Sequence, residues 1–512
     1  ETPEGFDASL NLDYFSERGP AVGIDNDYKL DNAVGEFKSY LIHDSGEDDL
    51  GRGRKNIEPE HELRGRLTWR HREYLPQDWE LTFELSYLSD RNFLEEYAEK
   101  EFDTDKDQET LLYLKKQVDH WAFTAHLQYR IADFLTQTER LPDFSFRLVG
   151  QPLHPGMTWF SEARAGFVRF RGAETTLRDF LIYGRTHQDS SGTTARAETR
   201  QEIDAPLDIG PWRIVPFVSG RAGAWDDTPE EGGQNRVFGA YGLRGSMYLW
   251  RTDAGVRSDL WDINGIRHVI KPDFVVWGSH TNVDSADLFA FDEDVEGIDE
   301  VDGATVGVRQ RWQTHRGPPD ARRTVDVFTW DIDVGAFNDG ERDEFTNGFA
   351  SFSRPENSIS RNFLNHSFVW RVNDATSLVN EMNFDLNDAE LDVFNLSAVV
   401  ERSPRLTYLI GYRYIQETES NLVGFGANYE LNEKYMLALR EEFDIDRGKT
   451  LDFTIGFLRR YPSWNVVVAF NLDEAEDDLG VTMSLAPQGF SGAALGPKRF
   501  TGMADSMKIT SR

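Results

Sequence analysis

Apolar and polar residues alternate with a period of two along most of the chain. Phe6, Ala8, Leu10, Leu12 and Tyr14 are separated by single acidic or polar residues. Because successive side chains of a β-strand point to opposite faces, this segment predicts a strand with one apolar and one polar face. The same alternation recurs many times, for example in residues 79–87, 121–131, 406–414 and 451–457. The pattern predicts an all-β protein.

Turn-forming residues separate these segments, as in residues 17–20, 338–340 and 446–449. Such short polar connections suit hairpins, so the strands are expected to be antiparallel. We count about 24 or 25 candidate strands, roughly one per 20 residues, each able to hold the 9–11 residues of a membrane-crossing strand plus a connection.

Two classes of β protein fit this alternation, a soluble propeller or sandwich and a transmembrane barrel. A propeller would show a repeat of about 40–45 residues, which is absent. A barrel places its polar residues in a wet lumen and collects aromatic residues at strand ends. Aromatic residues are placed in this way at Trp69, Tyr74, Trp79, Tyr87, Trp121, Tyr129, Trp159 and Trp250. We therefore predict a large antiparallel transmembrane β-barrel of about 24–26 strands over residues 1–486, followed by a mobile tail over residues 487–512.

Composition excludes several other classes. The 512 residues carry a net charge of −34 and contain no cysteine. A disulfide framework, a thiolate zinc site and a cysteine nucleophile are therefore excluded, and the acidic charge disfavours nucleic-acid binding. The chain has no run near the roughly 18–20 apolar residues of a spanning helix. It begins at Glu1 without the pattern of a secretion signal.

Interruptions of the alternation predict long loops. Residues 91–110 are charged, with Phe93, Leu94 and Tyr97 spaced as one face of a helix. Three acidic stretches, at residues 226–231, 282–302 and 473–478, are assigned to long extracellular loops.

Local motifs do not indicate catalysis. Asp292, Asp294 and Glu296 imitate the start of a calcium loop, but Gly303 stands where the closing carboxylate should be, so a solvated acidic loop is predicted. No nucleophile elbow is present, and residues 448–450 fit a hairpin turn better than a phosphate loop. We expect no enzyme activity, no metal and no cofactor.

A row of arginines is the most distinctive local constellation. Arg64, Arg66, Arg70 and Arg72 share the polar face of one predicted strand. Four guanidinium groups on one wall could bind phosphate or carboxylate groups. The alternative is that they pair with acidic lumen residues and fix the shape of the barrel, the candidate partners being Asp7, Asp13, Asp25 and Asp27.

Four strings resemble the barrel of the LPS-assembly outer-membrane proteins, the LptD or organic-solvent-tolerance family. They are RGP at residues 18–20, SDRNFL at 89–94, FLTQTERLP at 134–142 and GIRHVIKP at 265–272. The last contains Arg267, His268 and Pro272 and is similar to a signature in the middle of the family's barrel. The resemblance covers residues from about 6 to about 486.

The resemblance implies an outer-membrane translocon of about 26 strands rather than an enzyme. Such a barrel receives lipopolysaccharide from a periplasmic bridge protein, holds a plug lipoprotein, and releases the lipid into the outer leaflet through a seam between its first and last strands. The seam is then expected at Leu10, Leu12 and Tyr14 on the first strand and at Val481, Met483, Leu485 and Pro487 on the last. The last strand is expected to be short, from Val481 to Leu485, and is followed by Pro487, which lacks the N–H that a ladder needs. This fits a weakly paired seam and fits an ordinary barrel end equally well.

The sequence departs from that family in three ways. The inter-domain disulfides found in many members are impossible in a chain without cysteine. The periplasmic jellyroll that precedes the barrel is absent from these 512 residues, and the predicted lumen is acidic although lipopolysaccharide is anionic. A passive porin or substrate-specific diffusion channel, and a soluble carbohydrate-binding β protein, therefore stay open as alternatives at this stage.

Overall fold

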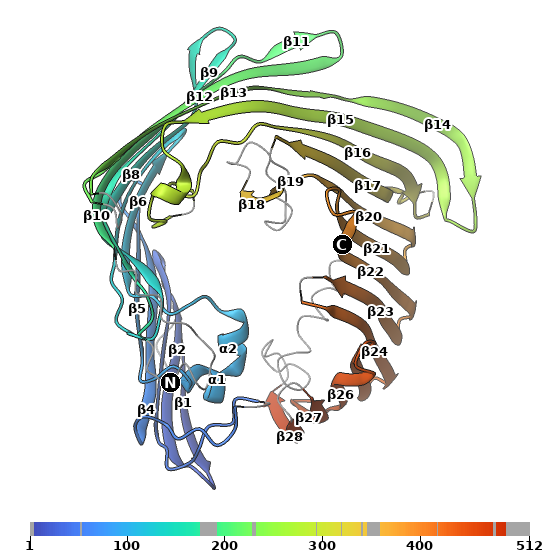
Figure 1. Cartoon of the computed structure of the whole chain (residues 1–512). Helices are drawn as coiled ribbons and strands as arrows, with labels where there is room; N and C mark the ends of the chain where they lie inside the picture. The colour runs from blue at the N-terminus through green and yellow to red at the C-terminus, as the bar shows by residue number, and fades with distance from the viewer. Residues whose placement is uncertain are drawn as a thin grey trace. The chain divides into compact units, whose positions relative to one another are not determined.

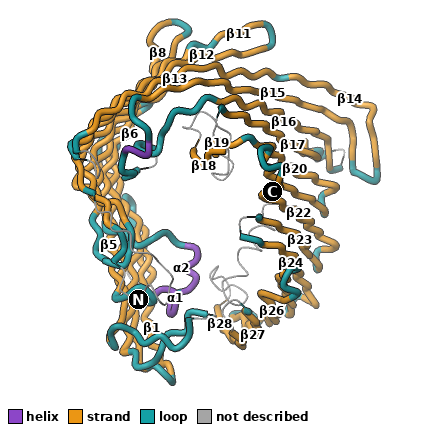
Figure 2. The backbone as a smooth tube through the Cα atoms, in the orientation of Figure 1, coloured by secondary structure: helices purple, strands orange, loops and turns teal. Residues whose placement is uncertain are grey.

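Strands dominate the protein (Figures 1 and 2). The computed structural model describes residues 5–51, 54–174, 192–227, 232–292, 294–318, 320–338, 341–345, 359–416, 418–474 and 478–487. Within these residues, 26 strands pair into one sheet, and β18 and β19 form a separate pair. Neighbouring strands such as β8 and β9 pair in antiparallel register. The predictions of an all-β antiparallel fold and of 24–26 strands are confirmed. The tail predicted at residues 487–512 lies, apart from Pro487, outside the described residues.

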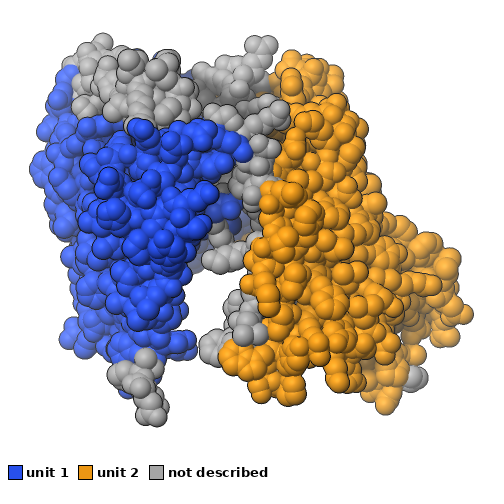
Figure 3. Space-filling model, turned by 90° about the horizontal axis from the view of Figure 1, so that it is seen from below, with its two compact units in different colours: residues 1–207, 215–242, 278–300 blue, residues 208–214, 243–277, 301–512 orange. Residues whose placement is uncertain are grey.

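The described chain divides into two compact units (Figure 3). Unit 1 comprises residues 1–207, 215–242 and 278–300, and unit 2 comprises residues 208–214, 243–277 and 301–512. Strands β12 (Trp212–Trp225), β13 (Gln234–Met247) and β15 (Ile263–Thr281) contribute residues to both sets, as does the three-residue β11 (Leu207–Ile209).

Unit 1 contains most of the long connections. Its complete strands are β1 (Phe6–Phe15), β2 (Gly19–Lys29), β3 (Ala33–His43), β4 (Leu63–Leu75), β5 (Trp79–Leu88), β6 (Leu111–Val118), β7 (Trp121–Gln128), β8 (Gln137–His154), β9 (Met157–Arg171) and β10 (Thr193–Asp204).

Unit 2 contains the remaining complete strands. They are β14 (Leu249–Ser258), β16 (Gly303–Arg316), β17 (Arg323–Phe337), β18 (Glu341–Phe345), β19 (Ile359–Arg361), β20 (Phe363–Asn373), β21 (Thr376–Asp385), β22 (Glu390–Ser403), β23 (Leu406–Ile415), β24 (Ser420–Asn432), β25 (Tyr435–Asp444), β26 (Lys449–Arg460), β27 (Trp464–Asp473) and β28 (Asp478–Pro487).

Among the described residues, helix is confined to short segments of the connections. These are α1 (Phe93–Tyr97), α2 (Glu99–Thr104) and the 3-10 turn η1 (Ser285–Asp287). The predicted helical face is confirmed, because Phe93 and Leu94 are buried and Tyr97 packs beside them. Helices α1 and α2 lie against one side of strands β1–β5 (Figure 1). Among the described residues, no helix has the length and apolar character needed to cross a membrane.

The apolar faces of the strands are exposed. The exposed fractions of Leu12, Val306 and Val481 are 72%, 55% and 74%. In the described chain, buried apolar side chains instead form small clusters, one of which joins Ala21 and Ile42 to helix α1. Exposed apolar surface on this scale requires a partner, and for alternating strands that partner is lipid. The polar faces carry the charged side chains and the folded connections.

The last strand differs from its prediction. A short strand over residues 481–485 was expected, whereas β28 runs over ten residues, from Asp478 to Pro487. Its register with β27 is continuous, from the pair Asp473–Asp478 to the pair Trp464–Pro487. Pro487 stands at the final pair, so its missing N–H does not interrupt the ladder.

Candidate functional site

Strand β1 presents a bare apolar face. The exposed fractions of Leu10, Leu12 and Tyr14 are 63%, 72% and 76%, larger than those of Val22 and Ile24 on the neighbouring strand. Strand β1 pairs with β2 through all ten of its residues, from Phe6–Tyr28 to Phe15–Gly19. The three seam residues predicted on the first strand therefore project together from one face of a terminal strand of unit 1.

The polar face of β1 is tied to β3 across the intervening strand β2. The hydroxyl of Tyr40 on β3 donates a hydrogen bond of 2.7 Å to the carboxylate of Asp13 on β1. The ring of Tyr40 passes over Gly23, which lies between them: a Cβ atom at Gly23 would sit 2.6 Å from Cδ2 of Tyr40. Because real Cβ contacts are longer than this, the crossing requires glycine at this position.

Helix α1 fixes the far end of β1 through Tyr97. The ring of Tyr97 makes an edge contact with Phe15, the last residue of β1, at a centroid distance of 5.7 Å. The guanidinium of Arg18, in the turn after β1, donates 3.0 Å to the Tyr97 hydroxyl and 2.6 Å to Glu96. Together with the Tyr40–Asp13 hydrogen bond, these contacts form what we call the β1 clamp.

Strand β28 also presents a bare apolar face. Leu479, Val481 and Met483 have exposed fractions of 65%, 74% and 72%. Leu485 and Pro487 pair in register with Val466 and Trp464 of β27. The predicted seam residues on the last strand thus belong to a terminal strand of unit 2.

The arginine row begins with a buried residue. The side chain of Arg64 has no exposed surface, and its guanidinium makes five hydrogen bonds of 2.6–3.2 Å to the carboxylates of Asp44, Asp48 and Asp90. Asp44 and Asp48 come from the connection between β3 and β4, and Asp90 follows β5. Arg64 is therefore enclosed by connections folded back onto the polar face, and we call this group the Arg64 cluster.

The other arginines of the row become progressively more open. Arg66 pairs with Glu101 of α2. Arg70 pairs with Asp105 at 2.8 Å and with Glu36 at 3.1 Å, whereas the side chain of Arg72 is 52% exposed and lies 3.5 Å from Glu80. The arginines do pair with carboxylates, but the partners differ from the expected Asp7, Asp13, Asp25 and Asp27: Asp13 accepts from Tyr40, and Asp25 accepts from Asn11.

Protonation of the Arg64 cluster follows from its hydrogen bonds. Burial by itself raises the pKa of Asp44, but hydrogen bonds from Tyr97, the Gly46 amide and Arg64 outweigh it and lower the pKa. Burial raises the pKa of Tyr97, and its hydrogen bond to Asp44 raises it further. Asp44 is therefore ionised while the Tyr97 hydroxyl keeps its proton and donates it over 2.6 Å.

The connection over residues 282–302 corrects a prediction. We expected a solvated acidic loop, but Val295, Ile298 and Phe291 have exposed fractions of 1%, 5% and 5%, and Glu296 is fully buried. Asp292 binds Arg140 through both carboxylate oxygens, and Glu296 accepts 2.9 Å from Arg196 and 3.0 Å from Trp225. This Glu296 cluster is buried because arginines on β8 and β10 neutralise the acidic residues that made the segment look solvated.

The two other acidic stretches are described only in part, since residues 228–231 and 475–477 fall outside the described chain. Within the described residues, Asp226 accepts from the backbone of Ala195 and from Thr194. Groups of three or more acidic, histidine or cysteine side chains arranged to hold a metal ion do not occur in the part of the chain that the structure describes.

The arginines of the Glu296 cluster lower the pKa of Asp292. Burial raises the pKa of Asp292, but the hydrogen bonds and positive charges of Arg140 and Arg196 outweigh it and bring it to about 2. Arg236 completes the cluster by donating to the backbone carbonyls of Val295, Glu296 and Ile298. The loop is thus held through both its side chains and its backbone.

The motif residues Arg267, His268 and Pro272 lie on β15. The ring of His268 stacks on Trp312 of β16 at a centroid distance of 4.2 Å and lies 3.2 Å from Gln310, while Arg267 is exposed. Pro272 lies two residues beyond Ile270, the last partner of β14. A proline is tolerated at such a change of partner because no β14 residue requires its missing N–H.

Sequence reasoning missed the β1 clamp and the arginine partners of the acidic loop. Gly23 inside an alternating segment is a signal for close approach by a neighbouring group, but it does not say that Tyr40 is that neighbour. The 128–152 residues between the Asp292 carboxylate and its partners Arg164 and Arg140 leave no local signal at all.

Comparison with known proteins gives a family match for part of the chain. Residues 62–294 match the family model LptD, LPS transport system D. No curated protein matches the chain. Among solved structures, the chain is similar to a Rh. blastica porin mutant (10% identity, TM-score 0.23, 65% of this chain and 99% of that one). It is also similar to the FrpB iron transporter from Neisseria meningitidis (10% identity, TM-score 0.33, 95% and 81%). The match over residues 62–294 supports the resemblance drawn from the sequence: this part of the chain is of the LptD type, and an outer-membrane location follows from it.

Proposed function

We propose that this barrel inserts lipopolysaccharide into the outer leaflet through a seam between β1 and β28. The observation that carries the proposal is the LptD match. Exposed apolar faces on both terminal strands, with Leu12 at 72% and Val481 at 74%, support a lipid route along these strands. An open strand edge in lipid costs several kcal/mol for each unpaired backbone group, so such a seam needs a device that controls its first strand.

The β1 clamp is suited to that task. It holds β1 at Asp13, Phe15 and the following Arg18, all at the end where the long connections lie. The start of β1 has a lighter attachment, the ring stack of Phe6 on Tyr28 at 5.7 Å. In this proposal β1 therefore separates first at its Phe6 end, which lies beside the short turn between β2 and β3.

The proposed partners follow from the same family. A periplasmic bridge protein would deliver the lipid, and a plug lipoprotein would occupy the lumen. Short turns of outer-membrane barrels face the periplasm, so the bridge is placed at the end of the short connections, such as residues 155–156 between β8 and β9. The long connections, including 282–302, are placed on the outer side.

Photocrosslinking in living cells tests the seam. A photoreactive residue is placed at Leu10 or at Met483, and at Val306 as a control that is also apolar and 55% exposed but lies on β16. We expect lipopolysaccharide adducts at Leu10 and Met483 that disappear when transport is de-energised, and only background at Val306.

Two outcomes contradict the proposal. Equal adducts at all three positions would mean ordinary contact with membrane lipid rather than a seam. No adducts, together with steady single-channel conductance from the folded and surface-located chain, would indicate a diffusion channel instead.

A further inference from the structure

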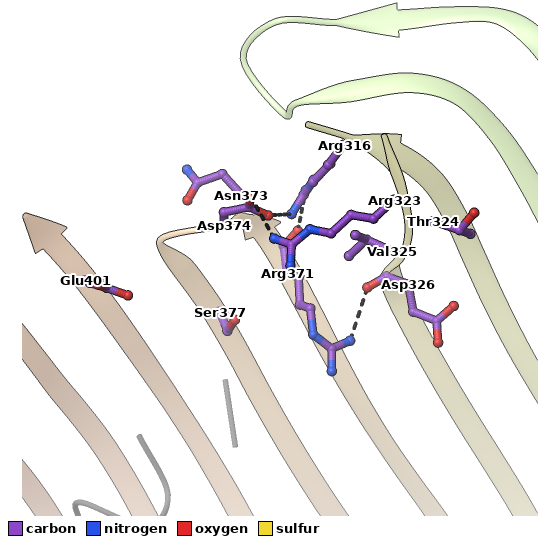
Figure 4. Close-up of a pocket in the computed structure, with 10 residues that line it drawn as sticks. All are labelled: Arg316, Arg323, Thr324, Val325, Asp326, Arg371, Asn373, Asp374, Ser377 and Glu401. Carbon is purple, nitrogen blue, oxygen red and sulfur yellow. Dashed lines mark hydrogen bonds and ion pairs between the residues drawn. The ribbon is translucent and has the colours of Figure 1, made fainter. Parts of the chain in front are cut away.

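Unit 2 contains a cavity of about 500 Å³ on its polar face, near the short turn between β20 and β21 (Figure 4). Side chains from β16, β17, β20, β21 and β22 line it together with the Asp374 turn. Three of the lining residues are arginines, Arg316, Arg323 and Arg371. On a chain with a net charge of −34, a pocket with three guanidinium groups is unusual and calls for an account of each one.

Arg316 is a structural residue. Its side chain is 1% exposed, and its guanidinium donates to the backbone carbonyls of Trp261, Asp262, Arg371 and Val372 at 2.8–3.2 Å. It also lies 3.3 Å from the carboxylate of Asp262 and 3.4 Å from that of Asp374. Its donors are used in joining the strand ends, so it holds the wall of the pocket rather than a ligand.

Arg371 makes fewer contacts than Arg316 among the described residues. One of its nitrogens, Nη1, donates 3.1 Å to the backbone carbonyl of Asp326. Within the described residues, no carboxylate lies within ion-pair distance of it. An arginine has five N–H donors, so most of those of Arg371 stay available on the pocket side. Figure 4 shows its guanidinium extending into the space between Asp326 and Ser377.

Arg323 adds a second positive charge that is partly neutralised. Its Nη2 lies 2.9 Å from Asp374, and its side chain is 62% exposed. Glu401 stands at the opposite side of the pocket, on β22. The lining also contains Asp326 and Asp374, which lie on the same side of the pocket as the guanidinium groups, while the exposed Glu401 lies across from them. Asp374 pairs with Arg316 and Arg323, so Arg371 is the arginine of the pocket that no carboxylate of the described residues neutralises.

We propose that this pocket binds an anionic phosphate or carboxylate group of a glycolipid headgroup, with Arg371 as the principal ligand and Arg323 as the second. A guanidinium with free donors forms bidentate, charge-assisted hydrogen bonds to such groups. The inference rests on the proposed function, because it supplies a positive contact for anionic lipopolysaccharide at the short-turn end of an otherwise acidic barrel. A free phosphate ion carries the same chemistry, and the test separates the two sources.

The experiment uses the purified full chain with a photoreactive residue at Glu401, an exposed position that lines the pocket. Adducts are scored with lipopolysaccharide, with dephosphorylated lipopolysaccharide, and with lipopolysaccharide plus excess inorganic pyrophosphate. We expect a clear adduct with the first probe only. Arg371→Gln should lower the adduct about tenfold, because it removes charge-assisted hydrogen bonds to the anion, and Arg371→Lys should lower it less.

Arg413→Gln is the control, because Arg413 is another arginine of unit 2, on β23, and does not line the pocket; it is exposed, whereas Arg371 is half-buried. It should leave the adduct unchanged.

Equal loss of the adduct in both variants, or an undiminished adduct with dephosphorylated lipopolysaccharide, overturns the inference. If no lipid adduct forms but pyrophosphate binds the purified chain in calorimetry and Arg371→Gln abolishes that binding, the glycolipid assignment is overturned in favour of a free anion. Adducts at the pocket but none at Leu10 and Met483 would contradict the seam and leave the pocket standing. Adducts at Leu10 and Met483 but none at the pocket would contradict the pocket and leave the seam standing.

Discussion

Arg64 in unit 1 and Arg371 in unit 2 both lie on the polar face of a strand, but they differ in burial and in hydrogen-bond partners. Each projects from the polar face of a strand, β4 or β20, that alternates between apolar and polar residues. Arg64 has no exposed side-chain surface and five hydrogen bonds to three carboxylates. Within the described residues, the guanidinium of Arg371 makes one hydrogen bond, to a backbone carbonyl, and it borders a cavity.

The difference comes from the connections and not from the strands. The described parts of the connections after β3 and after β5 fold back over Arg64 and bring the carboxylates of Asp44, Asp48 and Asp90 with them. Strands β20 and β21, in contrast, are joined by a turn of two residues, Asp374 and Ala375. Arg64 is thus a structural residue because long connections cover it, whereas the short turn beside Arg371 leaves that arginine as a candidate ligand.

The largest effect is expected for Arg64→Met, which tests whether the buried Arg64 is structural. Removing the cation leaves three buried carboxylates without their partner, and breaking a buried ionic group in this way costs about 3–5 kcal/mol. We expect a large drop in the free energy of unfolding measured with urea in detergent micelles, with early loss of protection against hydrogen exchange in residues 89–105.

Arg72→Gln and Arg371→Gln are the controls for that measurement. Arg72 is 52% exposed and Arg371 lacks a carboxylate partner among the described residues, so each change should cost less than about 1 kcal/mol. A loss at Arg371 equal to that at Arg64 would mean that the two regions do not differ as described.

Glu296 is a second buried charged group, and we expect it to stabilise the loop that contains it. Glu296→Gln keeps the shape of the side chain but weakens the charge-assisted hydrogen bonds from Arg196 and Trp225. We expect a loss of about 2 kcal/mol, seen as faster hydrogen exchange over residues 283–300 while β20 and β21 are unchanged. Unchanged exchange in that loop would show that the burial of Glu296 does not hold it.

The same loop should respond to acid. The pKa of Asp292 is about 2 in the folded chain against an ordinary value of 3.8. Since the folded pKa is the lower one, the stability that Asp292 contributes is complete above about pH 4 and is lost as the pH falls toward 2, about 2 kcal/mol in all. Urea unfolding between pH 5 and pH 2 measures it, and Asp292→Asn should remove this step from the profile.

The smallest effect is expected at the β1 clamp. Tyr40→Phe removes the hydrogen bond to Asp13 and keeps the ring over Gly23, so we expect about 1 kcal/mol of local destabilisation. Hydrogen exchange should quicken in residues 10–15 of β1 and not in β27. No change in β1 would show that Tyr40 does not restrain the strand.

The sequence by itself determined the class of fold and indicated the family resemblance. A period of two needs no tertiary information, because the geometry of a single strand decides which side chains share a face. The strand number, the helical face at Phe93 and Leu94, and the strings that resemble the LPS-assembly family were all local signals of this kind.

Only the tertiary structure decided which charges meet. Asp292 and Arg140 are 152 residues apart, and Arg64 and Asp90 are 26 residues apart. An acidic segment without a nearby arginine in sequence is correctly expected to be solvated, since an unpaired buried carboxylate is too costly. The folded connections supply the partners, and this reverses the expectation for residues 282–302 while leaving Arg371 free to bind.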